Sequence, residues 1–207
     1  MKTRQYSTRT LVVLTLFCAT VVQADVFPEM AWDGMAQYRV VDLHSPVYTN
    51  QAKAGLMEIT YLDNSYLAYC GQLSEYAGSG TVLSQTPLID LPNGGALAYM
   101  ANTWYNPMAS DDDAAALQLA FWEILYEAQG NPWSLGSGDV WVEQTNLATL
   151  ANNMLADIPA GGAAYTDAFL LEVDQAQDMI VIPEPMTMSL LALGGTALIV
   201  RCRKHTT

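Results

Sequence analysis

Two residues of this sequence, Cys70 and Gln118, carry side chains that can react covalently with each other. The sulfur of a cysteine can attack the side-chain carbonyl carbon of a glutamine, and if ammonia leaves, the product is an internal thioester. Such a bond crosslinks the chain and holds an electrophile that an outside nucleophile can open. It would also protect the thiol from oxidation and consume an amide that is costly to bury without partners.

Cys70 has no obvious disulfide partner in the sequence. The chain has three cysteines, but Cys18 and Cys202 lie in terminal segments that we expect to be removed. In an oxidising compartment a single remaining thiol is buried and inert, paired with another chain, or committed to other chemistry.

Cys70 is expected late in a β-strand, just before a turn rich in glycine and serine. Segments 36–43, 55–62 and 65–72 have the branched and aromatic residues of strands. In the third segment, Tyr66, Ala68 and Cys70 would share one face. Segment 168–182 predicts one or two further strands that close the domain.

Gln118 is expected on the apolar face of a helix. Ser110 is a suitable N-cap, the acidic residues 111–113 favour the helix N-terminus, and Gly130-Asn131-Pro132 ends the helix. At about 100° per residue, Gln118 falls within an apolar arc, while Glu123 and Glu127 are predicted to face solvent. A core glutamine that bonds to nearby backbone remains an alternative interpretation. Two more helices are predicted, one around residues 97–104 and one around 145–158.

Around these two residues the chain resembles the bacterial thioester domains of Cys-Gln surface adhesins. That family pairs an aromatic-Cys element, here Tyr69-Cys70, with an apolar-Gln-x-x-apolar-aromatic helix, here residues 117–122, and the likeness spans about residues 38–155. The resemblance implies a single α+β domain with antiparallel β-structure and a helical insertion. It also implies that Cys70 supplies the sulfur and Gln118 the acyl group, and that the product couples to surface nucleophiles such as lysine amines.

A thioester has to be shielded from water and still be reachable by one nucleophile, which aromatic walls achieve. Ordinary core packing is the alternative for each aromatic candidate. His44 is a candidate for proton transfer, with a surface or core role as the alternative. Lys53 is the only lysine between the two termini, so self-reaction through an internal amine has few opportunities. The aromatic candidates for the thioester pocket are Tyr69, Trp104, Phe121 and Trp122.

Both ends of the chain predict processing signals. A basic start, an apolar stretch over residues 11–22 and small residues before position 25 predict a Sec signal peptide, residues 1–24, cleaved after Ala24. At the other end, Pro183-Glu184-Pro185, an apolar segment and a basic tail resemble the PEP-CTERM sorting signal of Gram-negative bacteria, residues 183–207. The resemblance implies an exosortase as processing partner and transient residence of the C-terminal helix in the inner membrane; a plain membrane anchor is the alternative.

The remaining segment, residues 25–182, is then an exported domain at the cell surface or in the extracellular matrix. Because the stalk domains usual in wall-anchored adhesins are not present, a biofilm or matrix role is the expectation. The domain would couple to an amine- or hydroxyl-bearing polymer or protein. A non-covalent matrix or carbohydrate-binding module, displayed by the same sorting signal, is the alternative function.

Composition and motifs exclude several other classes. Residues 25–184 contain Arg39 and Lys53 against all 21 acidic residues of the chain, which makes nucleic acid a poor partner. No serine-hydrolase, zinc or nucleotide signature is found, so no cofactor and no metal are expected. Glu123 and Glu127, predicted on an outward helix face, do not suggest a glycosidase. The protein is therefore predicted to be a single-use covalent binder rather than a turnover enzyme.

Overall fold

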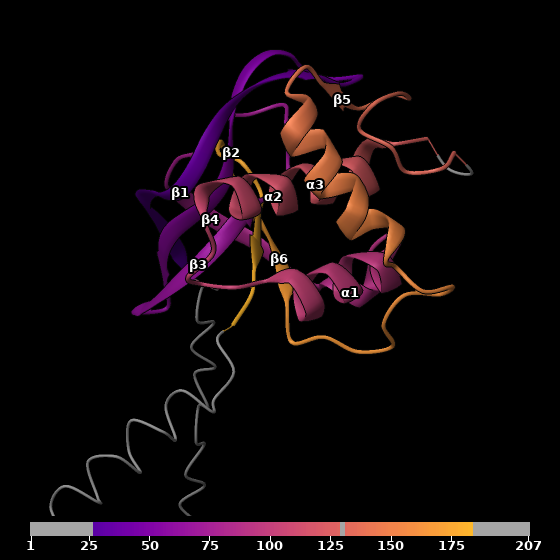
Figure 1. Cartoon of the computed structure of the whole chain (residues 1–207). Helices are drawn as coiled ribbons and strands as arrows, with labels where there is room; N and C mark the ends of the chain where they lie inside the picture. The colour runs from indigo at the N-terminus through magenta and orange to yellow at the C-terminus, as the bar shows by residue number, and fades with distance from the viewer. Residues whose placement is uncertain (1–26, 129–130, 184–207) are drawn as a thin grey trace, which may run out of the picture.

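The computed structural model describes residues 27–128 and 131–183 and has an α+β fold, as predicted (Figure 1). Seven strands, all paired antiparallel, accompany three helices and one 3-10 turn. Ala24, Glu184, Pro185 and the segments around them lie outside the described residues, so the processing signals remain predictions. The elements are β1 (Glu29–His44), β2 (Thr49–Tyr61), β3 (Asn64–Cys70), β4 (Gly80–Pro87), η1 (Leu88–Asp90), α1 (Gly94–Trp104), α2 (Asp111–Tyr126), β5 (Trp141–Val142), α3 (Thr145–Ala156), β6 (Phe169–Val173) and β7 (Met179–Val181).

Six of the strands form a closed ring. The order in the sheet is β2-β3-β7-β6-β4-β1-β5, and β1 also pairs with β2, which joins the two ends of the row. β1 is long enough to serve both neighbours: it pairs with β2 along nearly its whole length and with β4 near its start. The closing strands β6 and β7 come from the segment that the sequence predicted for them, and β7 pairs with β3 beside Cys70.

The helices form an insertion between β4 and β6 and gather on one side of the strands (Figure 1). α2 is central, because it contacts β1 and β2 as well as α1 and α3. Its N-terminus is fixed as predicted: the Ser110 hydroxyl accepts a hydrogen bond from the Asp113 N–H at 3.2 Å. Asp111 and Asp112 also form ion pairs with Arg39 on β1, which joins the start of the helix to the sheet.

Two parts of the sheet could not be predicted from alternation. β4 follows the glycine- and serine-rich turn and has only Val82 fully buried, so its pattern lacks a clear apolar face. The first half of β1 contains two irregularities of register, one of them at Gly34, which interrupt the period of two. α2 also ends at Tyr126, before the predicted stop, because the backbone of Glu127 is extended.

Among the residues that the structure describes, no helix has both the length and the apolar character needed to span a membrane.

Candidate functional site

At the end of β3, one edge of the strand has no neighbouring strand although it is buried in the protein. The last pair of β2 with β3 in this direction joins Met57 to Ala68, so β2 does not pair with Cys70. On the opposite edge, the Gly71 N–H donates to the Asp178 carbonyl at 2.7 Å. The backbone groups of successive strand residues point to opposite edges of the strand. The N–H and C=O of Cys70 therefore point to the edge on which β2 lies earlier in β3, beyond the last pair between the two strands.

The side chain of Gln118 fills this edge. Its Oε1 accepts a hydrogen bond from the Cys70 N–H at 2.7 Å, and its Nε2 donates to the Cys70 carbonyl at 2.8 Å. The amide therefore takes the place of a neighbouring strand, and both of its polar atoms are satisfied although the residue is 0% exposed. The two residues that the sequence singled out are thus in direct contact.

The thiol of Cys70 lies in the same buried environment. It is 3% exposed, and its Sγ donates to the Gln72 carbonyl at 2.7 Å. Burial raises the pKa of the thiol to about 12, so the sulfur carries its proton at neutral pH. A free Cys70 in this environment would react slowly with external oxidants or alkylating reagents, because the thiolate is the reactive form.

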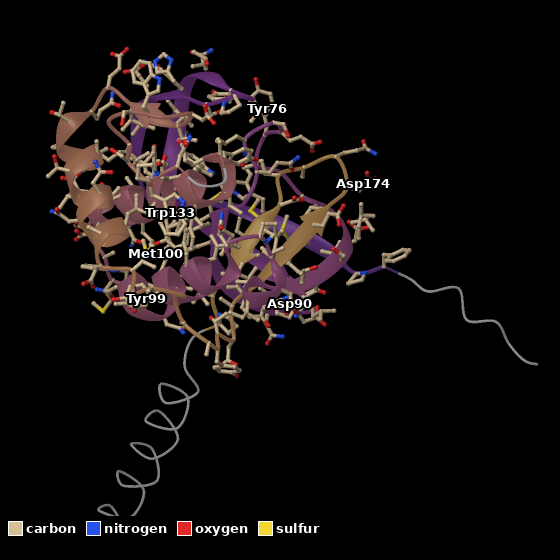
Figure 2. The ribbon with its side chains drawn as sticks, turned by 90° about the vertical axis from the view of Figure 1, so that its right-hand side faces the viewer. Tyr76, Asp90, Tyr99, Met100, Trp133 and Asp174 are labelled. Carbon is tan, nitrogen blue, oxygen red and sulfur yellow. The ribbon has the colours of Figure 1, made fainter. Side chains whose placement is uncertain are left out.

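A pocket of about 320 Å³ opens beside Cys70. Its aromatic walls are Trp122 from α2, Trp32 from β1, Tyr48 from the β1–β2 turn and Tyr76 from the loop after β3. Tyr76 is 88% exposed and stands at the surface of the molecule (Figure 2). The pocket therefore leads from solvent to the cysteine between mainly aromatic and apolar side chains.

Of the four aromatic candidates from the sequence, the structure places Trp122 in this pocket. Tyr69 and Phe121 are fully buried and contact each other, with ring centroids 5.4 Å apart, but they do not line the pocket. Trp104 packs against the core at the end of α1, also away from the pocket lining. Trp32, Tyr48 and Tyr76 were missed because they come from three separate segments and share no local motif with Cys70.

His44 does not line the Cys70 pocket. Its ring stacks on Trp141 of β5, with centroids 3.7 Å apart and planes at 4°, and its Nε2 is 3.7 Å from a Glu143 oxygen. These contacts hold β5 against the end of β1. His44 therefore occupies a structural position.

The prediction that Glu123 and Glu127 face solvent was wrong, because both side chains are buried, at 0% and 6% exposure. The loop after α2 folds back over this face of the helix, which a helical wheel does not reveal. Glu123 accepts a hydrogen bond from the Ser134 N–H at 2.5 Å. Glu127 accepts from the backbone of Asp139 at 2.7 Å and from the side chain of Asn131 at 2.6 Å. The two carboxylates therefore anchor the loop to the helix.

The two carboxyl groups have opposite pKa shifts. Burial raises the pKa of Glu123 to about 7, the nearby charges of Glu127 and Asp139 add to this, and the Ser134 N–H opposes it. For Glu127, burial also raises the pKa, but the hydrogen bonds from Asn131 and from the loop backbone outweigh it, and the pKa is lowered overall.

Replacing Glu123 with glutamine should make the protein less sensitive to pH. The folded-state pKa of about 7 exceeds the unfolded value of about 4.3, so the folded state binds the proton more tightly. The stability associated with this proton is present below about pH 4.3 and is lost as the pH rises through about 7. Urea unfolding from pH 5 to 8 should therefore show the Glu123→Gln variant gaining stability relative to the wild type. Parallel pH profiles for the two proteins would contradict this assignment.

Within residues 27–128 and 131–183, no group of three or more His, Cys, Asp or Glu side chains is arranged to hold a metal ion. No protein-family model, curated protein or solved structure matches the chain.

Proposed function

We propose that this protein is an exported surface or matrix protein that forms an internal thioester between Cys70 and Gln118 and couples through it to nucleophiles of a partner. One observation carries the proposal: the buried Gln118 amide is held on both sides by the backbone of the residue that bears the sulfur. Any backbone edge would satisfy a core glutamine, whereas the edge that Gln118 uses belongs to the residue that carries the thiol.

In the formation step, the Sγ of Cys70 bonds to the Cδ of Gln118 and the bond from Cδ to Nε2 breaks. The thiol proton passes to Nε2, which leaves as ammonia, so no oxidant or external acid is needed. Negative charge develops on Oε1 during the attack, and the Cys70 N–H is already bonded to this oxygen at 2.7 Å. A donor fixed in advance at such a position stabilises the transition state, and the fold holds the reactants together.

In the coupling step, the nucleophile of the partner bonds to Cδ and the bond from Cδ to Sγ breaks. A proton of the nucleophile passes to the sulfur, so that Cys70 becomes a free thiol again. Once the thioester has formed, Cδ is bonded to the side chain of a residue that lines the pocket. The pocket is then the route by which an amine or hydroxyl group reaches the acyl carbon, and its aromatic walls limit hydrolysis by water.

Gln118 is consumed in this reaction, so the protein acts once and is not a turnover enzyme. The predicted signal peptide and PEP-CTERM signal provide the setting, namely export, processing by an exosortase and display at the surface or in the matrix of a Gram-negative bacterium. The proposed target is an amine- or hydroxyl-bearing polymer or protein, and adhesion within a biofilm is the proposed role.

The test is the intact mass of the purified protein before and after exposure to methylamine. The wild type should be lighter than its sequence by one ammonia, and methylamine should add at Gln118 while freeing the Cys70 thiol. Cys70→Ala and Gln118→Ala should both have full mass and form no adduct. A wild-type protein of full mass whose Cys70 is alkylated after unfolding would overturn the proposal and favour a non-covalent matrix or carbohydrate-binding module.

A further inference from the structure

We propose that Lys53 is an internal nucleophile of this site, which captures the acyl group of Gln118 when no external nucleophile arrives. The inference rests on the proposed thioester. Lys53 is the only lysine between residues 27 and 183, and it lines the same pocket as Cys70. The sequence suggested few opportunities for self-reaction, but in the structure the side chain of Lys53 lines the same pocket as Cys70.

The strand register explains how Lys53 comes to this position. β2 pairs with β3 at Met57 and Ala68, and Cys70 lies two residues beyond Ala68. Lys53 lies four residues before Met57 on β2, so their side chains project from the same face of the strand. Gly55 lies between them, where β1 approaches β2 so closely that a Cβ would meet the backbone of Gln37 and Tyr38. The route from the amine to the sulfur is therefore the pocket that Lys53 and Cys70 both line, and not the face of the strand.

In the structure the ammonium group of Lys53 makes a weak contact with an aromatic ring rather than with the cysteine. Its Nζ lies 5.1 Å from the ring centroid of Tyr38 on the neighbouring strand β1. A cation–π contact at an exposed site is worth about 0.5–1 kcal/mol, so the side chain can leave it at little cost. Lysine also has a flexible four-carbon stem, which allows the amine to move from the tyrosine toward the pocket.

The capture step is a transfer of the acyl group from sulfur to nitrogen. The ammonium group of Lys53 first loses one proton to solvent. The resulting neutral amine bonds to the Cδ of Gln118, the bond from Cδ to Sγ breaks, and a second proton of the nitrogen passes to the Cys70 sulfur. The product is an isopeptide between Lys53 on β2 and Gln118 on α2, and its mass equals that of the thioester. The step ends the coupling capacity of the protein and joins two elements that already contact each other.

The experiment follows the mass, the Cys70 thiol and the crosslinked peptides of the full protein during incubation without added nucleophile. The wild type should remain lighter by one ammonia, gain a free Cys70 thiol and yield a peptide pair joined between Lys53 and Gln118. The matched control is Lys53→Arg, which keeps the positive charge and can stack on Tyr38 but is not acylated. Its methylamine-reactive lifetime should exceed that of the wild type by about tenfold, because an intramolecular competitor has been removed.

The other outcomes are distinguishable. If the thioester of both proteins decays equally and by addition of water, Lys53 is not the internal nucleophile, although the thioester stands. If neither protein lacks ammonia, the thioester is overturned, and the role of Lys53 with it. A crosslink between Lys53 and Gln118 that also forms in a Cys70→Ser variant would overturn the route through sulfur.

Discussion

In a Cys70→Ala background, in which no thioester can form, replacing Gln118 with glutamate should lower the free energy of unfolding by about 3 kcal/mol or more at pH 8, as expected when a buried charge lacks a partner. A carboxylate retains the acceptor for the Cys70 N–H but cannot donate to the Cys70 carbonyl, which Nε2 now does at 2.8 Å. Burial should raise the pKa of the new carboxyl above its unfolded value, so the folded state binds the proton more tightly. The loss of stability should therefore shrink as the pH is lowered toward 5, which urea unfolding can measure.

The control for the added charge is Gln51→Glu, because Gln51 is exposed and its side chain forms no hydrogen bond within the described residues. This change should alter stability by no more than about 0.5 kcal/mol. With Cys70 retained, Gln118→Glu should also form no methylamine adduct, since its carboxyl group has no ammonia to lose. A stability loss as small as that of Gln51→Glu, or one that does not depend on pH, would show that the amide is not held as the structure has it.

Replacing Gly55 with alanine should destabilise the protein by about 3–5 kcal/mol, the combined cost of backbone strain and a steric clash. Gly55 has a φ of +149°, which L side chains rarely adopt, and a Cβ there would lie 2.1 Å from the Gln37 carbonyl oxygen and 2.7 Å from the Tyr38 Cα. Both atoms belong to the backbone of β1, so they cannot move aside without disturbing the longest strand pairing of the fold.

Gly34→Ala separates these two costs, because Gly34 has a similar φ of +132° but open space around the position of a Cβ. Its expected loss is the strain alone, about 1–3 kcal/mol. Urea unfolding of both variants measures the difference. If Gly34→Ala were as damaging as Gly55→Ala, the close approach of β1 and β2 at Gly55 would not be the cause.

The place of Cys70 in its strand and of Gln118 in its helix was predictable because each residue follows a local period, whereas their contact across 48 positions of sequence follows from neither period. Alternation places Cys70 late in a strand, and the helical period places Gln118 on an apolar face; both placements are confirmed. The walls of the pocket follow no such rule, since Trp32, Tyr48 and Tyr76 meet only through the ring of strands and the loop after β3.

The error at Glu123 and Glu127 has a different physical origin. The helical period correctly separates the two glutamates from the apolar arc, but it describes one element without its neighbours. The loop that covers them is held by its own backbone N–H groups, such as those of Ser134 and Asp139. Backbone N–H donors of this kind do not depend on the residue types in the loop. No residue pattern in the loop therefore predicts that the loop will bury a carboxylate.

The paired hydrogen bonds between Gln118 and Cys70 imply that the proposed reaction leaves a buried carbonyl without its donor, whichever nucleophile is captured. Release of ammonia removes the donor to the Cys70 carbonyl, which is buried and then lacks this partner. A primary amine restores an amide, but a trans secondary amide directs its remaining N–H away from the side on which its oxygen lies, and an ester has no hydrogen to donate. An unsatisfied buried carbonyl costs about 1–3 kcal/mol, so the structure around Cys70 should be less stable after coupling than in the unreacted protein, for amide and ester products alike.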